Sequence, residues 1–317
     1  MPRTDVVVLG DVNPDLVLSG AAAGAATGQR EVPVEEATLT VGGSGAIFAC
    51  GAARLGLGAT LIGAIAPDPF GRFMEAELVA RGVDTSGLVW RDGSSTGISV
   101  IVSSSTDRGI YTAPGAIAFL GIDDVDTARL TAARHVHVAA YFLQRGLQPG
   151  LPSLLATARR QGAVTSLDPN WDPAERWDGG LSGLLGQVDV FLPNEAEATR
   201  IAGVDDVEVA ARRLADRAGL VVVKLGGRGA FAVRRDTPAV RVGPVAGINI
   251  VDTTGAGDAF DAGFVHATLR GWELERALAF ANACGALSCR AAGGVDAQPT
   301  LDEALALVAE GDASAPE

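Results

Sequence analysis

Lysine is nearly absent from this sequence of 317 residues, in which Lys224 is the only one. A P-loop nucleotide site needs the order Gly-Lys-Ser/Thr, whereas Leu225 follows the lysine here. The lysine and His-Arg-Asp signatures of protein kinases are missing as well. Both of these phosphate-handling classes are therefore excluded.

Positive charge of any kind is also scarce. The chain has 25 Lys and Arg residues against 38 Asp and Glu residues, which gives a formal net charge of −13. Such an excess of acid disfavours nucleic acid and anionic membranes as partners. An anionic substrate would need a local positive site, such as the N-terminus of a helix, rather than a basic face.

Cysteines and long apolar runs are few. Cys50, Cys284 and Cys289 lie among small apolar residues without the spacing of a metal site, and we expect reduced thiols. No uncharged stretch approaches the ~20 apolar residues of a membrane span. The first residues enter a strand pattern without the apolar region of a signal peptide, so we expect a cytoplasmic protein without membrane contact.

The sequence does contain a regular alternation of short apolar runs and amphipathic segments. This pattern predicts an α/β fold, a doubly wound and mostly parallel sheet flanked by helices. Parallel strands are expected at 6–10, 59–65, 135–140, 163–167, 189–192 and 220–225, an antiparallel pair at 231–234 and 240–242, and a strand-like segment at 247–251. Helices are expected at 47–55, from the stretch 67–71 to about 81, and at 151–161, 174–185, 195–202, 207–217, 258–269, 274–290 and 301–310.

Residues 16–41, 96–102 and 108–113 instead alternate polar and apolar side chains. They predict a small second sheet, one face of which must cover something. A lid over a ligand site and a dimer surface would each satisfy this requirement. We expect a single domain over residues 1–311, with lid strands from about 16–41 and 96–113, and a frayed tail at 312–317.

The stretch 251–260 contains two threonines and a Gly-Ala-Gly turn before a predicted helix. Small residues allow a ligand to approach the backbone, and the first amides of a helix attract anions. Asp258 would repel a phosphate there unless it takes a proton from a hydroxyl that attacks the phosphate. The stretch also approaches a dinucleotide fingerprint, but Phe260 replaces the third glycine and no βα unit follows, which disfavours NAD binding.

Other polar positions have two interpretations each. Asp15 follows the first strand, where ligands bind, but turn chemistry explains it equally well. Asn194 and Glu197 fit a helix capping box or a pair that holds hydrated Mg²⁺ near a phosphate. His135 and His137 lack partners with metal spacing, so we expect a structural role.

These motifs resemble, in order and spacing, those of the ribokinase-like (PfkB) carbohydrate and nucleoside kinases. Residues 252–260 resemble the second signature of that family, and residues 42–45 with their continuation to Gly71 resemble the first. Asn194 with Glu197 matches the family's Mg²⁺/phosphate motif, and residues 226–229 match its nucleotide-binding loop. The resemblance covers nearly the whole chain and implies a ribokinase-like fold with a small β-sheet lid.

The resemblance also implies a role for each matched position. Asp258 would be the general base, and the amides of Gly255, Ala256, Gly257 and Asp258 would form the anion hole for the transferring γ-phosphoryl group. ATP and Mg²⁺ would be held by Asn194, Glu197 (to Mg²⁺ through water), Lys224, Gly226, Gly227, Gly229 and Asn282. The hydroxyls of the acceptor would be held by Asn13, Asp15, Gly42 and Gly43. Asp252 and Thr254 match positions where many relatives bind a monovalent cation, usually K⁺, and the lid in many relatives also forms a homodimer.

Three further candidates for the acceptor site are specific to this chain. Ile47 replaces an asparagine that grips sugar hydroxyls in ribokinases, and a buried isoleucine cannot make those bonds. Tyr141 stands near the position expected for a substrate-binding acid, which suggests a more apolar acceptor or a different pose. Arg108 on the lid could reach an acidic group of the substrate, or it is a solvated lid arginine.

The sequence therefore predicts an enzyme that uses ATP to phosphorylate a primary hydroxyl of a small sugar. A nucleoside kinase on the same scaffold is the alternative, and a catalytically idle sugar or nucleotide sensor is a third reading.

Overall fold

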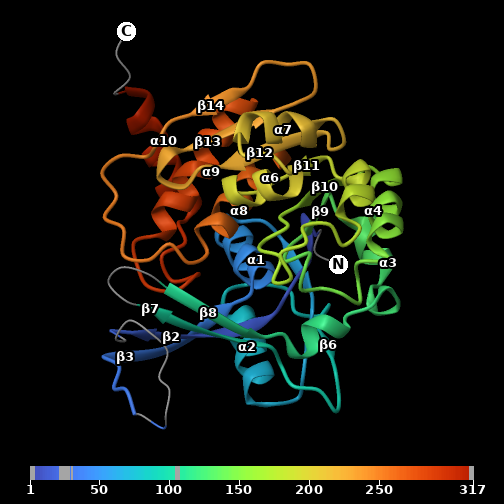
Figure 1. Ribbon diagram of the computed structural model, residues 1–317, viewed down its shortest axis with the longest axis vertical. Coiled ribbons are helices and arrows are strands. Elements are labelled where there is room, and N and C mark those ends of the chain that lie inside the picture. Colours follow the sequence, from blue (N-terminus) through green and yellow to red (C-terminus); the bar gives the residue numbers. More distant parts are fainter. Residues whose placement is uncertain (1–3, 21–28, 30, 104–107, 314–317) are drawn as a thin grey trace.

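The computed structural model describes residues 4–20, 29, 31–103 and 108–313, with only the backbone described at 103, 108 and 310–313. An eight-stranded sheet forms its centre (Figure 1), in the order β14-β13-β12-β11-β10-β9-β1-β4. The neighbours from β4 to β12 are parallel, and β13 and β14 continue the sheet in antiparallel fashion. The strands are β1 (Val6–Leu9), β4 (Ala59–Ile62), β9 (His135–Val138), β10 (Val164–Leu167), β11 (Val190–Phe191), β12 (Leu220–Lys224), β13 (Ala230–Val233) and β14 (Val240–Val242).

Helices cover both faces of this sheet because successive strand residues are apolar on both sides. In β1, Val6 and Val8 belong to one hydrophobic core and Val7 and Leu9 to the other. The first core packs against α1 (Ser44–Arg54), α2 (Pro69–Ala80), α8 (Ala256–Leu269), α9 (Leu274–Ser288) and α10 (Leu301–Ala313). The second packs against α3 (Thr127–Ala132), α4 (Leu151–Arg160), α5 (Leu181–Leu184), α6 (Glu195–Ala202) and α7 (Val207–Ala215).

A four-stranded sheet projects from the main body (Figure 1), in the order β3-β2-β7-β8. Its strands are β2 (Asn13–Ser19), β3 (Glu36–Gly42), β7 (Ile98–Ser103) and β8 (Arg108–Ala113). This confirms the predicted second sheet, although β2 begins before residue 16. A short pair, β5 (Ala64–Ile65) and β6 (Val89–Trp90), was not predicted in this form.

Most predicted elements are confirmed, and two are wrong. Within 174–185 only residues 181–184 are α-helical, because the preceding loop is tied to the Asp172 carboxylate by the amides of Ala174, Arg176 and Trp177. The segment 247–251 forms no strand. The last helix continues to Ala313 rather than ending at 310, so residues 312 and 313 of the expected frayed tail are helical. Residues 314–317 lie outside the described part of the chain.

No helix within the described residues is long and apolar enough to cross a membrane.

Candidate active site

The carboxyl ends of the parallel strands place polar residues along one edge of the main sheet. Asp11 follows β1, Asp168 follows β10, Asn194 follows β11, and Lys224 ends β12. Because β12, β11, β10, β9 and β1 are neighbours in this order, residues far apart in the sequence meet at this edge. Such an edge is where open α/β sheets bind their ligands.

The first turn of α8 approaches the same edge. Gly255 precedes the helix with a φ of 72°, and a Cβ atom there would lie 2.8 Å from the backbone of Gly294. Only glycine fits both the left-handed backbone and this contact. The amides of Gly257 and Asp258 have no carbonyl partner within the helix, and they carry the positive end of its dipole. The structure thus forms the geometry of an anion site at the predicted stretch.

Asp258 is the third residue of α8 and is only 8 % exposed. Burial, with the nearby carboxylates of Asp168 and Asp11, raises the pKa of Asp258 well above its usual range, while the charge of Lys224 and a hydrogen bond with Ser44 act in the opposite direction. A raised pKa is the property that a carboxylate needs to serve as a general base near neutral pH. Its chemistry therefore suits the predicted role.

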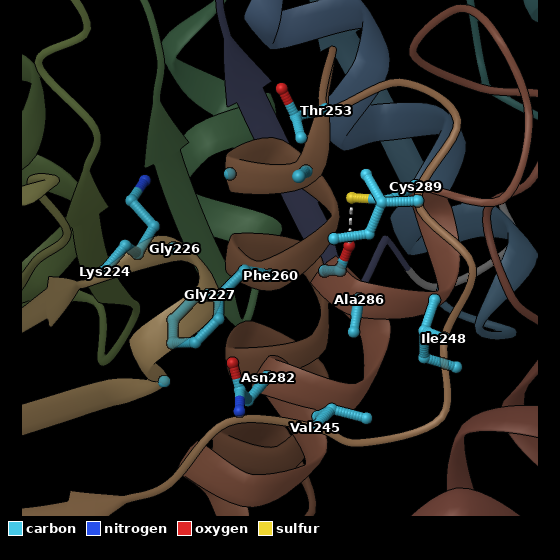
Figure 2. Close-up of a pocket in the computed structure, with 15 residues that line it drawn as sticks. Lys224, Gly226, Gly227, Val245, Ile248, Thr253, Phe260, Asn282, Ala286 and Cys289 are labelled. Atoms are coloured by element: carbon cyan, nitrogen blue, oxygen red, sulfur yellow. Dashed lines mark hydrogen bonds between the residues drawn. The ribbon is translucent and has the colours of Figure 1, made fainter.

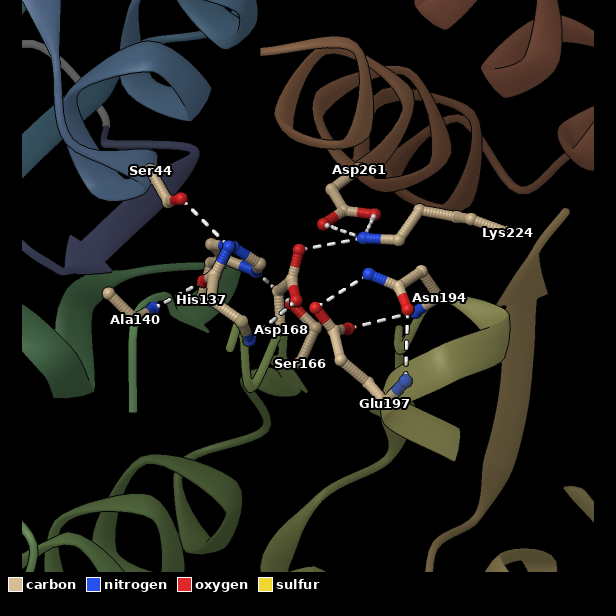
Figure 3. A network of polar contacts seen from close by, with 10 residues as sticks. Ser44, His137, Ala140, Ser166, Asp168, Asn194, Glu197, Lys224 and Asp261 are labelled. Atoms are coloured by element: carbon tan, nitrogen blue, oxygen red, sulfur yellow. Dashed lines mark hydrogen bonds and ion pairs between the residues drawn. The ribbon is translucent and has the colours of Figure 1, made fainter. Parts of the chain in front are cut away.

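Lys224 lies in a cage of carboxylates beside this helix turn (Figure 3). Its Nζ is 2.6 Å from Asp168 Oδ2 and 3.0 Å from Asp261 Oδ2. These two carboxylates raise the pKa of Lys224 despite its burial, so the side chain is a fixed cation. A Cβ atom on Gly257 would lie 3.5 Å from Nζ, which places the ammonium at the anion site.

Asn194 and Glu197 form the capping box of α6. The Asn194 side chain accepts a bond from the Glu197 amide at 2.9 Å, and Glu197 Oε2 accepts one from the Asn194 amide at 2.9 Å. Burial, and then the charge of Asp168, raises the pKa of Glu197 to about 7. The helix-cap interpretation is confirmed, and the Mg²⁺ role of this pair stays a prediction.

A cavity of about 200 Å³ opens beside the first turn of α8 (Figure 2). The structure brings together here the predicted nucleotide residues Lys224, Gly226, Gly227, Gly229 and Asn282, along with Ala256 and Gly257 of the anion site. The other lining residues are Val245, Ile248, Ile250, Thr253, Phe260, Gly285, Ala286 and Cys289. An apolar cleft that ends at an anion site has the shape required by a planar base with a phosphate tail.

The predicted acceptor residues gather where the four-stranded sheet meets α1. Asn13 Nδ2 lies 3.2 Å from Asp15 Oδ1 and 3.2 Å from Ser99 Oγ, and all three residues are buried. A Cβ atom on Gly42 would lie 1.9 Å from Asp15 Oδ1, so the carboxylate requires glycine at that position. Gly43 precedes α1 directly. Burial, and then the charge of Asp11, raises the pKa of Asp15 to about 7.

Ile47 and Tyr141, two of the three further candidates for the acceptor site, are buried in apolar surroundings rather than beside this polar cluster. Ile47 is 3 % exposed and packs against the glycines at 255 and 294. Tyr141 is 1 % exposed in the core, and its hydroxyl donates to the carbonyl of Gly179 at 2.7 Å. A role for Tyr141 in binding the acceptor does not fit this placement, because the only polar atom of its side chain already bonds to the Gly179 carbonyl.

Arg108 begins β8, and its side chain lies outside the described residues. Its backbone is four residues along the strand from Thr112, the partner of Ser99. At ~3.3 Å per residue, the four-residue separation places the backbone of Arg108 roughly 13 Å from the Asn13–Asp15–Ser99 cluster.

Asp252 shapes the loop before α8. Its Oδ1 accepts bonds from the amide and the hydroxyl of Thr254 at 2.9 and 2.8 Å, and its Oδ2 accepts one from the Gly293 amide at 2.9 Å. No group of three or more His, Cys, Asp or Glu side chains among the described residues could hold a metal ion. The monovalent cation at Asp252 and Thr254 therefore remains a prediction.

His135 and His137 have the packing expected of structural residues. Both imidazoles share the Ser166 hydroxyl, at 2.7 and 2.8 Å, and the His137 ring stacks on Phe48 at 3.9 Å. Burial lowers the pKa of each imidazole to about 3, so both rings are neutral.

Sequence reasoning placed residues 11–15 and 168–173 at the ligand edge of the sheet, but it gave no individual role to several residues of the site. Asp261 lies one turn after Asp258 on the same helix face, a spacing that could have revealed it. Asp11 accepts a bond from the Gly45 amide at 2.8 Å, and Asn170 connects the Ala140 amide to the Ser44 hydroxyl at 2.7 and 2.8 Å. These partners are distant in the sequence, so no local pattern marks them.

Comparison with known proteins gives a consistent picture. The model of the pfkB family carbohydrate kinases matches residues 3–301. The chain is 32 % identical to an ATP-dependent ribose-1-phosphate kinase of Halopiger xanaduensis, over 96 % of this chain and 98 % of the relative. It is 30 % identical to a ribokinase of Haemophilus influenzae, with the same shares covered. The structure of an Arabidopsis thaliana ribokinase complexed with ribose and ATP superposes with a TM-score of 0.83, at 22 % identity and over 96 % of this chain and 99 % of the other.

The family match spans nearly the whole chain, and the fold is the ribokinase-like one that the motifs implied. The first turn of α8, the caged lysine and the cavity beside them lie in one place on that fold. The chain belongs to the pfkB family of carbohydrate kinases.

Proposed function

We propose that this protein transfers the γ-phosphoryl group of ATP to a primary hydroxyl of a small sugar. The single observation that carries the proposal is the position of Asp258. The first turn of α8 lines the nucleotide cavity through Ala256 and Gly257. Asp258 in the same turn lies near enough to Ser44, the first residue of the helix that follows Gly43, for the Ser44 hydroxyl to lower its pKa. A carboxylate so placed lies where a nucleotide and an acceptor would meet.

In the proposed mechanism, Asn13 and Asp15 hold the hydroxyls of the acceptor, and its primary hydroxyl points to Asp258. Asp258 takes the proton of that hydroxyl as the oxygen attacks the γ-phosphorus, and the bond from that phosphorus to the bridging oxygen of ATP breaks, so that ADP leaves. The amides at the start of α8 and the ammonium of Lys224 stabilise the charge that the transferring group carries. This requires no covalent intermediate on the protein.

The residues at the edge of the sheet fit ATP and Mg²⁺. The cavity supplies an apolar cleft for the base and a cationic end at Lys224 for the phosphates. A structural neighbour from E. coli was solved with ATP and Mg²⁺. Bound Mg²⁺ would neutralise the phosphates, and Glu197 would reach it through water, because Mg²⁺ keeps most of its hydration shell. K⁺ at Asp252 and Thr254, a homodimer and a cytoplasmic location belong to the same proposal.

A nucleoside kinase is the second candidate, and one observation favours it. Val17 and Ile101 share the face of the small sheet that carries Asp15 and Ser99, as does Ile110. Val17 and Ile101 are buried, and Ile110 is 55 % exposed, so one exposed apolar side chain lies beyond the polar cluster. Such a surface suits the base of a nucleoside better than the hydroxyls of a second sugar ring.

The experiment is a measurement of ADP release with ATP, Mg²⁺ and a panel of free sugars and nucleosides, in KCl and again in NaCl. Release that depends on a sugar supports the proposal, and release with nucleosides alone favours the second candidate. Tight binding of a sugar without release would instead indicate a sensor, and lower activity in NaCl would support the K⁺ site.

A further inference from the structure

Asn170 joins three elements at the edge of the main sheet. Its Oδ1 accepts a bond from the Ala140 amide, after β9, at 2.7 Å. Its Nδ2 donates to Ser44 Oγ, at the start of α1, at 2.8 Å. The dashed lines at Ala140 and Ser44 in Figure 3 mark these two bonds. The backbone amide of Asn170 also donates to Asp168 Oδ1, at 3.1 Å, which holds the residue from a third side.

The bond from Ala140 decides which way the Asn170 side chain faces. A backbone N–H only donates, so the atom that meets it is the side-chain oxygen, and the NH2 group faces Ser44. Ala140 and Asn170 have φ angles of 52° and 53°, in the left-handed region. Such a backbone is unfavourable for residues other than glycine and is most frequent at functional sites. Two residues of this kind joined by one hydrogen bond point to a contact that serves the site.

Ser44 is left with a proton to donate. A serine hydroxyl has one proton, and because Asn170 already donates to its oxygen, that proton is directed to another acceptor. The first turns of α1 and α8 lie against each other, since a Cβ atom on Gly255 would lie 3.0 Å from Ile47 Cγ2. Ser44 is close enough to Asp258 for its hydroxyl to lower the pKa of that carboxyl. The Asp258 carboxylate is therefore the acceptor for the Ser44 proton.

We infer that Asn170 is a positioning residue for the proposed phosphoryl transfer, because it holds the Ser44 hydroxyl as a hydrogen-bond donor to the Asp258 carboxylate. The inference rests on the proposed function, in which Asp258 is the general base. A donor to a carboxylate stabilises its ionised form and fixes the direction of its oxygens. Asn170 thus acts on the base through Ser44, without contact with the substrate.

The other groups around Asp258 show why such a donor matters. The charges of Asp168 and Asp11 raise the pKa of Asp258, and the charge of Lys224 lowers it. Asp261, a further acid, lies one turn later on the same helix. The hydroxyl therefore acts together with Lys224 to keep the buried carboxyl ionised. Without the hydroxyl the pKa of Asp258 rises further, so the base becomes protonated at a higher pH.

The acidic limb of the kcat profile tests this, with any acceptor that gives ADP release. Ser44→Ala removes the donor and should move the limb to higher pH by about one to two units, as expected for one hydrogen bond to a charged group. Asn170→Gly removes the orienting side chain at a backbone that glycine adopts freely, and should move the limb in the same direction. Ser44→Thr keeps the hydroxyl and should leave the limb near its unmodified position.

A double variant tests whether Asn170 acts through Ser44. Asn170→Gly combined with Ser44→Ala should move the limb no further than Ser44→Ala alone, because the second change has nothing left to orient. Shifts that add up in the double variant would contradict the inference. So would a limb that stays in place in Ser44→Ala.

Thr165→Val is the control for a loss of stability. The buried Thr165 hydroxyl donates to the Gln187 carbonyl at 2.7 Å, at the opposite, amino end of β10. Its removal should lower Tm without moving the limb. If Ser44→Ala and Asn170→Gly behave in the same way as this control, both residues are only structural and the inference is wrong.

A titration without substrate separates the inference from the proposed function. Carbon-13 carboxyl resonances are followed against pH, and the resonance that is missing from Asp258→Asn identifies Asp258. Its pKa should be higher in Ser44→Ala than in the unmodified protein, and an unchanged pKa would overturn the inference even if the protein is a kinase. Absence of ADP release with every sugar and nucleoside would overturn the proposed function, while the titration would still decide whether Ser44 donates to Asp258.

Discussion

Lys224 Nζ lies 2.6 Å from Asp168 Oδ2, and the two residues come from the carboxyl ends of β12 and β10. The lysine side chain is 11 % exposed and the aspartate 3 %, so the pair is nearly withdrawn from water. Removing one partner of a buried ion pair leaves the other charge uncompensated, at a cost of about 3–5 kcal/mol. The only lysine of the chain is thus a fixed charge that lines the cavity beside α8, and Lys224 and Asp168 shift the pKa of Asp258 in opposite directions.

The first prediction concerns Asp258 as the general base. Asp258→Asn keeps the size of the side chain but removes the proton acceptor, so kcat should fall by about 10²–10⁴. ATP affinity, measured by calorimetry, should stay within a few-fold of the unmodified protein because the anion site is made of amides. A kcat within about tenfold of the unmodified value would show that Asp258 is not the base.

The second prediction concerns pH. Asp258 acts only when ionised, and its pKa is raised, so kcat should fall as the pH decreases through that raised pKa. Asp168 raises the pKa of Asp258 and Lys224 lowers it. Asp168→Asn should therefore move the acidic limb of the kcat profile to lower pH, and Lys224→Met should move it to higher pH.

Lys224→Arg keeps the positive charge and serves as the control for these profiles. Each variant is first checked for a cooperative thermal transition, because the buried pair also stabilises the fold. Shifts of both variants in the same direction would mean that the acidic limb reports another group.

The third prediction separates the two roles of Glu197. Glu197→Gln keeps an acceptor for the Asn194 backbone amide but loses the one that Oε1 offers to Asn194 Nδ2 at 2.7 Å, so Tm should fall only modestly. The lost charge should raise the Mg²⁺ concentration that gives half-maximal activity by several-fold. Glu195→Gln, an acid on the same helix whose partner is Arg228, is the matched control and should leave the Mg²⁺ dependence unchanged. A large loss of Tm with an unaltered Mg²⁺ requirement would assign Glu197 to capping alone.

The fourth prediction concerns the face of the small sheet opposite Asp15. Leu39, Leu16, Val100 and Tyr111 are successive cross-strand neighbours and form an apolar row across all four strands. Leu39 is 39 % exposed and Tyr111 62 %, as expected if a second copy covers the row. Light scattering should give twice the chain mass for the unmodified protein and the chain mass for Tyr111→Glu. Val209→Glu, at an exposed valine of α7, should not change the mass, and a monomeric unmodified protein would refute the dimer.

Local sequence patterns predicted much of this architecture. The apolar runs of β1 and β12 and the capping pair at Asn194 and Glu197 are visible in the sequence because they depend on nearest neighbours. The failure at 174–185 has a physical cause, since the apolar spacing there is helical while the Asp172 carboxylate captures three backbone amides. When a side chain binds backbone amides in this way, the apolar spacing of the segment does not lead to a helix.

The residues of the candidate site divide in the same way, into those that a local sequence pattern predicts and those that only the fold brings together. The sequence by itself determined the helix start that we propose as the anion site, because Gly255 and the helix after it form a local structure with Asp258 in its first turn. Only the tertiary structure decided what surrounds that carboxylate. Asp11, Asp168, Lys224 and Asp261 are brought together by the order of the strands and by the packing of α8 on their edge. Electrostatic interactions depend on distance in space and on burial, and neither can be read from spacing along a chain.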